Sequence, residues 1–243
     1  MKDNGFMFGD LATWDFLILR VEQYPQIPTP VRRTETYTIP GRSGVLHSTE
    51  EAFDPIEKSY SCYFHADKNV PATTMAIKAW LLADDGPQRL IDPYDPEHWF
   101  RATVAGGIQF ENWMGNYSRF VVTFSCDPRA FRRDGEEPRP LRTSGGAFYN
   151  PCAYACQPLI YVYGSGNGSL TIGDRVVTIT NMDTDLILDC EDMNAYRLIS
   201  GVEVSRNDRI SAPEFPVLQP GNNPVKWTGG ITGVDIVPRW FDL

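Results

Sequence analysis

The stretch PLIYVYGSGNGSLTIGDRVVTIT, residues 158–180, decides the fold class of this sequence. It contains three short runs rich in Val, Ile, Leu, Thr and Tyr, separated by GSGNG (164–168) and by a Gly-Asp pair. Runs of this length and composition, with turn residues between them, predict consecutive antiparallel strands. GSGNG lacks the Lys-Ser/Thr pair and the following helix of a phosphate-binding loop. We therefore interpret it as a flexible hairpin turn.

The same pattern continues to the end of the chain. Further β-rich runs are LILDC, AYRLI, EFPVL, VKW and VDIVPRWFDL. Strands that recur every ~8–12 residues with turn signals between them are typical of a β-sandwich. This predicts a sandwich domain over residues 151–243. The preceding stretch, 134–150, is charged, rich in Pro and Gly and without periodicity, which predicts a linker.

The first 133 residues form a second predicted β domain. Hydrophobic residues alternate with polar ones in residues 33–39, 57–66 and 117–126, the period of half-buried strands. The acidic stretch STEEAFDP (48–55) is expected to be an exposed loop or arm. Three aromatic residues are expected at exposed strand edges, where a neighbouring copy would cover them: Tyr60, Trp99 and Trp113.

One helix is predicted in this half, in PATTMAIKAWLLADDG (71–86). Ile77, Trp80 and Leu81 follow the i, i+3, i+4 spacing of an amphipathic helix. Thr73 or Thr74 is expected to cap its N-terminus, and Gly86 is expected to end it. The fold class is therefore mainly β, with an N-terminal domain containing one helix and a C-terminal sandwich.

Composition and charge exclude several classes of function. Hydrophobic residues make up 42% of the 243 residues, enough for a folded core. The formal net charge is −9 and no Lys- or Arg-rich face is present, so nucleic acid is not an expected partner. No apolar run approaches the ~18 residues of a membrane helix. The opening residues MKDNGFMFGD lack the apolar region of a signal peptide, which indicates synthesis in a cytoplasm.

The five cysteines also fit a cytoplasmic protein. Their number is odd and their spacing irregular, so we expect reduced and mostly buried thiols. CAYAC (152–156) has three residues between its cysteines and no histidine after His98 to complete a zinc site.

The segment NMDTDLILDCED resembles a calcium-binding loop in its spacing. Oxygen ligands at positions 1, 3, 5, 9 and 12 would come from Asn181, Asp183, Asp185, Asp189 and Asp192. However, position 6, where the loop requires glycine for a sharp turn, is Leu186, and position 12 is Asp in place of Glu. LILD also reads as a strand with Leu186 and Leu188 on one face. We interpret the segment as a polar turn leading into a strand, and expect no metal or other cofactor.

No catalytic set emerges from the sequence. The three histidines, His47, His65 and His98, have no Gly-x-Ser-x-Gly nucleophile motif beside them. Carboxylates are numerous, but no pair stands out for glycoside hydrolysis. We therefore expect a protein that acts by binding and is not an enzyme.

One candidate ligand site lies in EFPVLQPGNNPVKW (214–227). Sugar sites combine an exposed aromatic ring with convergent polar groups, and the candidates here are Asn222, Asn223 and Trp227. The alternative is a structural role, in which Pro220-Gly221 forms a tight turn and the Asn side chains satisfy backbone amides of the loop.

Several segments, taken in order, resemble the distal tail (Dit) proteins, the hub proteins of siphophage tails. TETYTIPGRSGVL (34–46) is similar to an early IPGRxG signature of that family, and RLIDPYDP through FSCDPRAF resembles the end of its N-terminal domain. In the second half, QPLIYVYGSGNGSLTIG, LILDCEDMNAY and FPVLQPGNNPVKW are similar as well. The resemblance covers nearly the whole chain.

The resemblance implies a structural virion protein. Its N-terminal domain would form a homohexameric ring, and its C-terminal domain would be a galectin-like β-sandwich. Implied partners are the tail tube protein, the tail-tip, fibre or tail-associated lysin protein, and in some relatives a receptor-binding protein. The expected location is the virion tail, assembled in the bacterial host cytoplasm. The acidic stretch 50–54 and the basic cluster Arg129, Arg132 and Arg133 are hypothesised to pair between neighbouring copies of the ring.

Two other functions stay open at this point. The C-terminal sandwich would be a lectin for host adsorption if Trp227 formed a sugar site. A cell-wall hydrolase with a sandwich appendage is the enzymatic alternative.

Overall fold

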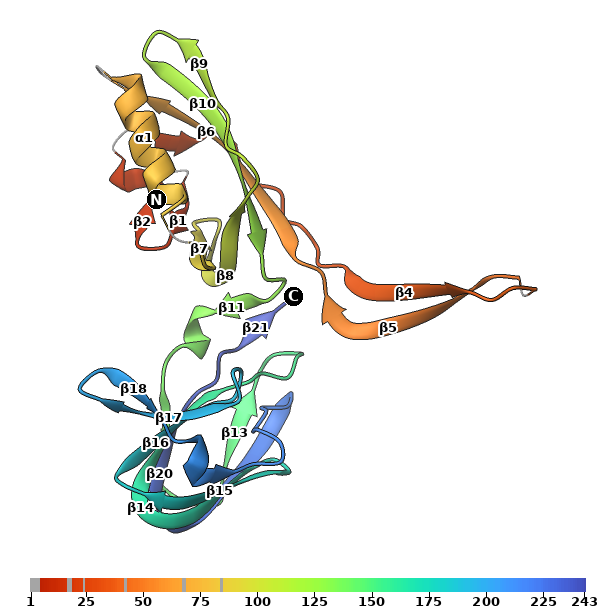
Figure 1. Ribbon diagram of the computed structural model, residues 1–243, viewed down its shortest axis with the longest axis vertical. Helices are drawn as coiled ribbons and strands as arrows, with labels where there is room; N and C mark the ends of the chain where they lie inside the picture. The colour runs from red at the N-terminus through yellow and green to blue at the C-terminus, as the bar shows by residue number, and fades with distance from the viewer. Residues whose placement is uncertain (1–4, 17–18, 24, 42, 67–68, 84) are drawn as a thin grey trace. The chain divides into compact units, whose positions relative to one another are not determined.

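The computed structural model of the chain describes residues 5–16, 19–23, 25–41, 43–66, 69–83 and 85–243 (Figure 1). It divides into two compact units, Met1–Ala130 with Leu243, and Phe131–Asp242. Both units consist mainly of strands. Among the described residues there is one α-helix, α1 (Val70–Leu81). The mainly β fold class predicted from the sequence is confirmed.

The first unit is built on an antiparallel sheet in the order β2–β1–β7–β8–β10–β6–β3, with β9 also paired to β10. The strand bounds are β1 Met7–Phe8, β2 Leu11–Ala12, β3 Leu19–Val21, β6 Ile56–His65, β7 Gln88–Asp92, β8 Asp95–Ala105, β9 Phe110–Met114 and β10 Tyr117–Cys126, with a 3-10 turn at Thr13–Asp15. Strands β4 (Arg32–Thr38) and β5 (Val45–Phe53) belong to the same unit but form a separate two-stranded sheet.

The long strands β6 and β10 follow the predicted alternation. They pair along ten residues, and their buried side chains, among them Cys62, Phe64, Phe120 and Phe124, belong to one core cluster. Tyr60 corrects one expectation, because its side chain is fully buried and its hydroxyl donates to Asp92 Oδ2 at 2.9 Å. The Trp99 side chain is half-buried under Arg89, and the side chain of Trp113 lies outside the described part of the chain.

Helix α1 covers this core with the predicted stripe. Ile77, Trp80 and Leu81 are buried, and Trp80 Nε1 donates to the Phe8 backbone oxygen at 2.9 Å. The predicted cap is wrong, because the helix begins one turn earlier than expected. Asn69 is the N-cap, and its side-chain oxygen accepts from the Ala72 backbone N–H at 3.1 Å. The helix ends at Leu81, five residues before Gly86, once Leu82 is turned outward.

The second unit is an antiparallel sheet folded over on itself. Its strands are β12 Arg139–Leu141, β13 Gly146–Asn150, β14 Leu159–Ile172, β15 Arg175–Met182, β16 Asp185–Asp189, β17 Asn194–Ile199, β18 Val202–Ser205, β19 Ile210–Ser211 and β20 Gly221–Val237, with 3-10 turns at Arg133–Gly135 and Asn207–Arg209. The short strands β11 (Ala130–Arg132) and β21 (Phe241–Asp242) pair with each other and are not part of this sheet. Two very long strands, β14 and β20, run through both halves of the fold and pair with each other.

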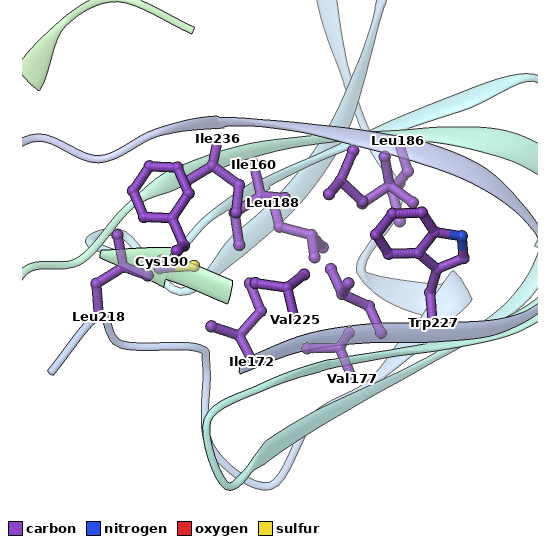
Figure 2. Packing of buried hydrophobic residues seen from close by; sticks show 14 of the residues in the cluster. Ile160, Ile172, Val177, Leu186, Leu188, Cys190, Leu218, Val225, Trp227 and Ile236 are labelled. Atoms are coloured by element: carbon purple, nitrogen blue, oxygen red, sulfur yellow. The ribbon is translucent and has the colours of Figure 1, made fainter. Parts of the chain in front are cut away.

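Each long strand changes partners along its length. Residues 159–163 of β14 pair with β16, whereas residues 166–172 pair with β15. Residues 221–225 of β20 pair with β13, and residues 234–236 pair with β12. Side chains from the two halves face one another across a single core, with Ile160, Leu188 and Ile236 opposite Ile172 and Val225 (Figure 2). The arrangement is that of a β-sandwich whose two sheets share two bent strands.

Glycines make the bend possible. The registers of β14 and β20 shift between Tyr163 and Gly168, where Gly164 and Gly168 lie against Gly229 and Gly230. A Cβ built on Gly230 would lie 1.7 Å from the Ser165 backbone oxygen, and one on Gly164 would lie 2.1 Å from the Gly230 oxygen. The two backbones therefore approach too closely for any side chain at these positions.

This geometry corrects the reading of GSGNG as a hairpin turn. Residues 164–168 lie inside β14, and the runs LIYVYG and SLTIG are parts of one strand. VKW and VDIV are likewise joined in β20. EFPVL contains no strand, although Leu218 forms an isolated bridge with Cys156.

Residues 134–150, where the sequence predicts a linker, contain β12 and β13, both paired with β20. These strands have three and five residues, which is too short for a periodic signal to show.

Candidate functional site

The hairpin formed by β4 and β5, residues 32–53 and hereafter called the arm, contributes none of its described residues to either core cluster. Every residue of β4 is exposed, including Tyr37. The two strands pair from Arg32–Phe53 to Thr38–Val45 in a sheet that is separate from the main sheet of the unit (Figure 1). The strand expected at residues 33–39 is present as β4, but the expectation that it is half-buried is wrong. The stretch 48–55, expected to be an exposed loop or arm, is largely strand β5 of this arm.

Local contacts hold the arm together at its base. The Asp54 backbone N–H donates to the Val31 oxygen at 2.9 Å, and Arg33 Nε pairs with Asp54 Oδ1 at 3.1 Å. Arg32 lies over the Phe53 ring, 4.8 Å from its centroid. Tyr37 donates to Glu35 on the same strand. These are exposed contacts, each of which contributes little to stability.

An isolated two-stranded hairpin is marginally stable in water. The arm also exposes Tyr37, Ile39 and Val45, which are between 40% and 50% accessible. The arm is thus a long hairpin whose apolar side chains are exposed to solvent. This arrangement is expected of a surface that a partner protein covers.

The candidate sugar-binding residues do not share one exposed face. Trp227 is 8% exposed and packs in the core of the second unit, where Figure 2 shows it near Leu186. Asn223 is buried as well, while Asn222 is exposed. The site thus lacks the accessible aromatic ring that would stack on a sugar.

The contacts of the loop 214–227 support a structural role for the Asn223 side chain and not a ligand site. Gly221 has φ +86°, as a tight turn after Pro220 requires. The Asn223 side chain accepts from the Gln219 N–H at 2.8 Å and donates to the backbone oxygens of Gln219, Gly221 and Phe148. Asn223 thereby satisfies the polar backbone of the loop and fastens it to β13.

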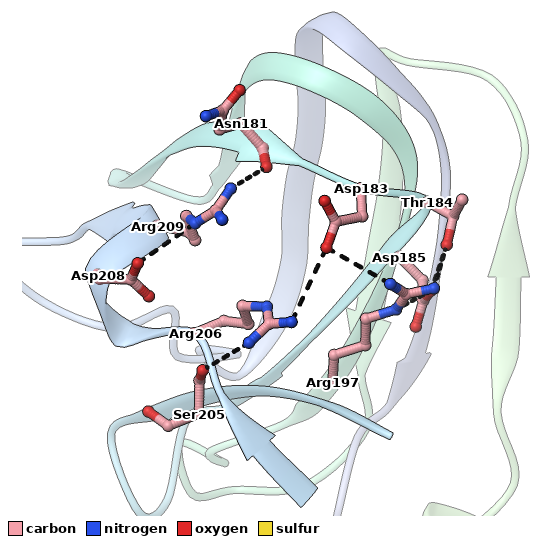
Figure 3. A network of polar contacts seen from close by, with 9 residues as sticks. All are labelled: Asn181, Asp183, Thr184, Asp185, Arg197, Ser205, Arg206, Asp208 and Arg209. Carbon is pink, nitrogen blue, oxygen red and sulfur yellow. Dashed lines mark hydrogen bonds and ion pairs between the residues drawn. The ribbon is translucent and has the colours of Figure 1, made fainter. Parts of the chain in front are cut away.

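Arginines occupy the positions beside the candidate calcium ligands. Arg197 donates to Asp185 at 2.9 Å, to Thr184 at 2.7 Å and to Asp183 at 3.4 Å, and Arg206 lies 3.9 Å from Asp183 (Figure 3). Asp185 through Asp189 form strand β16, with Leu186 and Leu188 buried as predicted. In the described part of the chain, no group of His, Cys, Asp and Glu is arranged to hold a metal ion.

Asp189 has a different partner, Arg239. Their side chains form two parallel hydrogen bonds of 2.7 and 2.8 Å, and the backbone N–H groups of Glu191 and Asp192 also donate to Asp189. Burial on its own favours the protonated acid. The hydrogen bonds and the positive charge of Arg239 outweigh it and hold the pKa of Asp189 below its ordinary value.

This lowered pKa predicts a pH-dependent contribution to stability. Asp189→Asn should lower the free energy of unfolding by about 2 kcal/mol at pH 7, because a charged, two-pronged pair is lost. The contribution is present above the unfolded-state pKa of about 4 and disappears as pH falls through the lower folded-state pKa. Urea unfolding of wild type and variant at pH 7 and pH 3 should show this difference shrinking. An equal difference at both pH values would contradict the assignment.

The cysteines and histidines form no catalytic arrangement among the described side chains. All five cysteines are free and buried, and burial raises the pKa of the Cys156 thiol to about 11, so it stays protonated at neutral pH. His98 pairs with Asp95 at 2.7 Å, and the His65 ring packs on Tyr117. The side chain of His47 lies outside the described part of the chain.

The basic cluster is largely neutralised within its own chain. Arg129 pairs with Asp127 at 2.6 Å and Arg132 with Asp134 at 2.9 Å. These contacts weigh against the hypothesis that the cluster pairs with residues 50–54 of a neighbouring copy. Within the described residues, no helix is long and apolar enough to span a bilayer.

The fold is that of phage tail hub and baseplate proteins. The chain is similar to the SPP1 Dit (gp 19.1) protein, described as a paradigm of the hub adsorption apparatus in phages that infect Gram-positive bacteria, with a TM-score of 0.73, 15% identity, and coverage of 97% of this chain and 98% of that one. It is also similar to a chain of the phage P2 baseplate in its activated conformation with Ca, with a TM-score of 0.57, 6% identity, and coverage of 97% and 98%. No protein-family model and no curated protein sequence matches the chain.

Proposed function

We propose that this protein is a structural component of a phage tail, the hub ring at the distal end of the tail tube. The observation that carries this proposal is the likeness of fold to a tail hub protein along 97% of the chain. The arm supports it, because a hairpin without a covering layer suits a protein that is completed by neighbouring chains. No comparable support exists for the lectin alternative, given the burial of Trp227.

In this proposal the first unit closes a homohexameric ring through contacts between one copy and the next. A repeated head-to-tail contact forms a closed ring when the rotation between copies fits. The tail tube protein would bind one face of the ring, and a tail-tip, fibre or tail-associated lysin protein would bind the other. The second unit would be available for a receptor-binding protein. Assembly would take place in the bacterial host cytoplasm, and the protein acts by binding.

Native mass spectrometry of the full chain tests the ring directly. We expect particles containing six copies of the 27.4 kDa chain. Light scattering at concentrations within the assembly range should give the same mass. A single-chain mass at every concentration, with or without the tail tube protein added, would contradict closure of a ring by this protein.

A further inference from the structure

A small recess in the first unit contains a buried ion pair. Its volume is about 170 Å³, and it is lined by the segment 25–28 and by residues of β6, β7 and β8. Ile27, Ile56 and Phe100 supply apolar walls, whereas Lys58 and Asp92 supply the charges. The Lys58 and Asp92 side chains are 7% and 4% exposed. A recess that is mostly apolar but contains a few buried polar groups is the usual composition of a binding site.

The two charged groups in the recess are unequally satisfied. The Asp92 carboxylate accepts from the Tyr60 hydroxyl at 2.9 Å and from the Tyr94 backbone N–H at 3.0 Å. The Lys58 ammonium lies 3.9 Å from Asp92 Oδ2 and 4.1 Å from the centre of the Phe100 ring. Both contacts are electrostatic, and among the described residues no oxygen accepts a hydrogen bond from Lys58. An ammonium has three protons to donate, so those of Lys58 are available to an acceptor that enters the recess.

The surrounding charges define which acceptor fits. Asp92 balances Lys58, and Asp95 also lines the recess, where it pairs with His98. An anionic ligand would add a further negative charge beside two carboxylates in a poorly solvated space, which is costly. A neutral carbonyl oxygen accepts the Lys58 proton without adding charge. The apolar walls favour a compact aliphatic group next to that carbonyl.

We propose that this recess binds an amide carbonyl carried beside an aliphatic side chain, as presented by a peptide segment of a partner protein. The carbonyl accepts a hydrogen bond from Lys58, and the aliphatic group contacts Ile27, Ile56 and Phe100. The inference is independent of the hub assignment, because it uses only groups inside the first unit.

Methyl NMR can be applied to a large assembly, so it can test the proposal on the full-length protein. The ligands are small amides that imitate a peptide segment. N-acetylleucine amide should shift the Ile27 and Ile56 methyl resonances in a saturable way, with a Kd on the order of 1–10 mM for so small a ligand. Its acid, N-acetylleucine, and the glycine analogue N-acetylglycine amide should each bind at least about tenfold more weakly. Equal binding of the acid, or no saturable shift from the amide, would overturn the proposal.

Two variants assign the contacts. Lys58→Met retains the aliphatic stem and should weaken amide binding about tenfold or more. Ile27→Ser changes a wall residue of the recess that is 93% exposed, so this variant should fold normally. It therefore tests the site even if Lys58→Met fails to fold. It should weaken binding by at least about threefold. The matched control Val31→Ser, 67% exposed and outside the recess, should bind like wild type. Unchanged affinity in Ile27→Ser would overturn the proposed site.

Discussion

Replacing the arm, residues 32–53, with a Gly-Asn-Gly turn is expected to abolish ring assembly while both units stay folded. The replacement is geometrically simple, because the Val31 oxygen and the Asp54 N–H are already hydrogen-bonded at 2.9 Å. None of the described residues of the deleted strands belongs to either of the two core clusters. The Arg33–Asp54 ion pair, which is lost at the base of the arm, is half exposed and contributes at most about 1 kcal/mol. Native mass spectrometry should therefore find single chains in place of hexamers.

Two measurements separate loss of assembly from loss of folding. The melting temperature and the methyl spectrum of the core should be close to those of wild-type chains diluted below the assembly range. A double substitution, Tyr37→Asp with Ile39→Asp, should also prevent assembly, because both side chains are exposed on the arm. The control Val176→Asp changes an equally exposed apolar residue on β15 and should leave the hexamer intact. Hexamers that persist without the arm would show that the ring closes through other surfaces.

Gly230→Ala is expected to cause the largest loss of stability of any single methyl addition in the second unit. The new Cβ would lie 1.7 Å from the Ser165 oxygen and 2.9 Å from its carbonyl carbon, both backbone atoms. Relief of that overlap requires β14 and β20 to separate at the bend they share. We expect a cost of at least about 3 kcal/mol, a large part of the ~5–15 kcal/mol that stabilises a typical domain.

The control for this substitution is Gly146→Ala. Gly146 lies in β13 of the same unit, and its added Cβ would have no atom closer than 3.8 Å. Urea unfolding followed through the methyl groups of Ile172 and Ile179 reports on the second unit separately from the first. Gly230→Ala should shift that transition strongly and Gly146→Ala only slightly. Similar shifts for the two variants would contradict a role for close backbone approach at the bend.

Local patterns were sufficient wherever one element packs on a single core. The period of two in residues 57–66 and 117–126 corresponds to β6 and β10, whose alternate side chains are buried. The stripe of Ile77, Trp80 and Leu81 packs as an amphipathic helix should. The resemblance to phage hub proteins was carried by several short segments in the same order, and the fold supports it over nearly the whole chain. In each case the signal lies in the spacing of neighbouring residues.

The sequence did not predict in the same way which distant segments pack against one another. GSGNG resembles a turn because glycines are common between strands. Gly164 and Gly168 are nevertheless inside a strand, where the absence of a side chain allows the backbone at Gly229 and Gly230 to lie against them. Trp227 and Asn223 look suited to a ligand until the folded strands enclose them. Asp183 and Asp185 resemble calcium ligands until Arg197, contributed by another strand, donates to both.

The sequence by itself determined the mainly β class, the position of the helix and the acidic character of the chain. Those properties follow from composition and from contacts between residues close in sequence. Only the tertiary structure decided which strands continue through a glycine bend, which polar residues are satisfied internally and which hairpin is left without a covering layer. These depend on which segments lie side by side, and side chains far apart in the chain carry no mutual spacing from which that can be read.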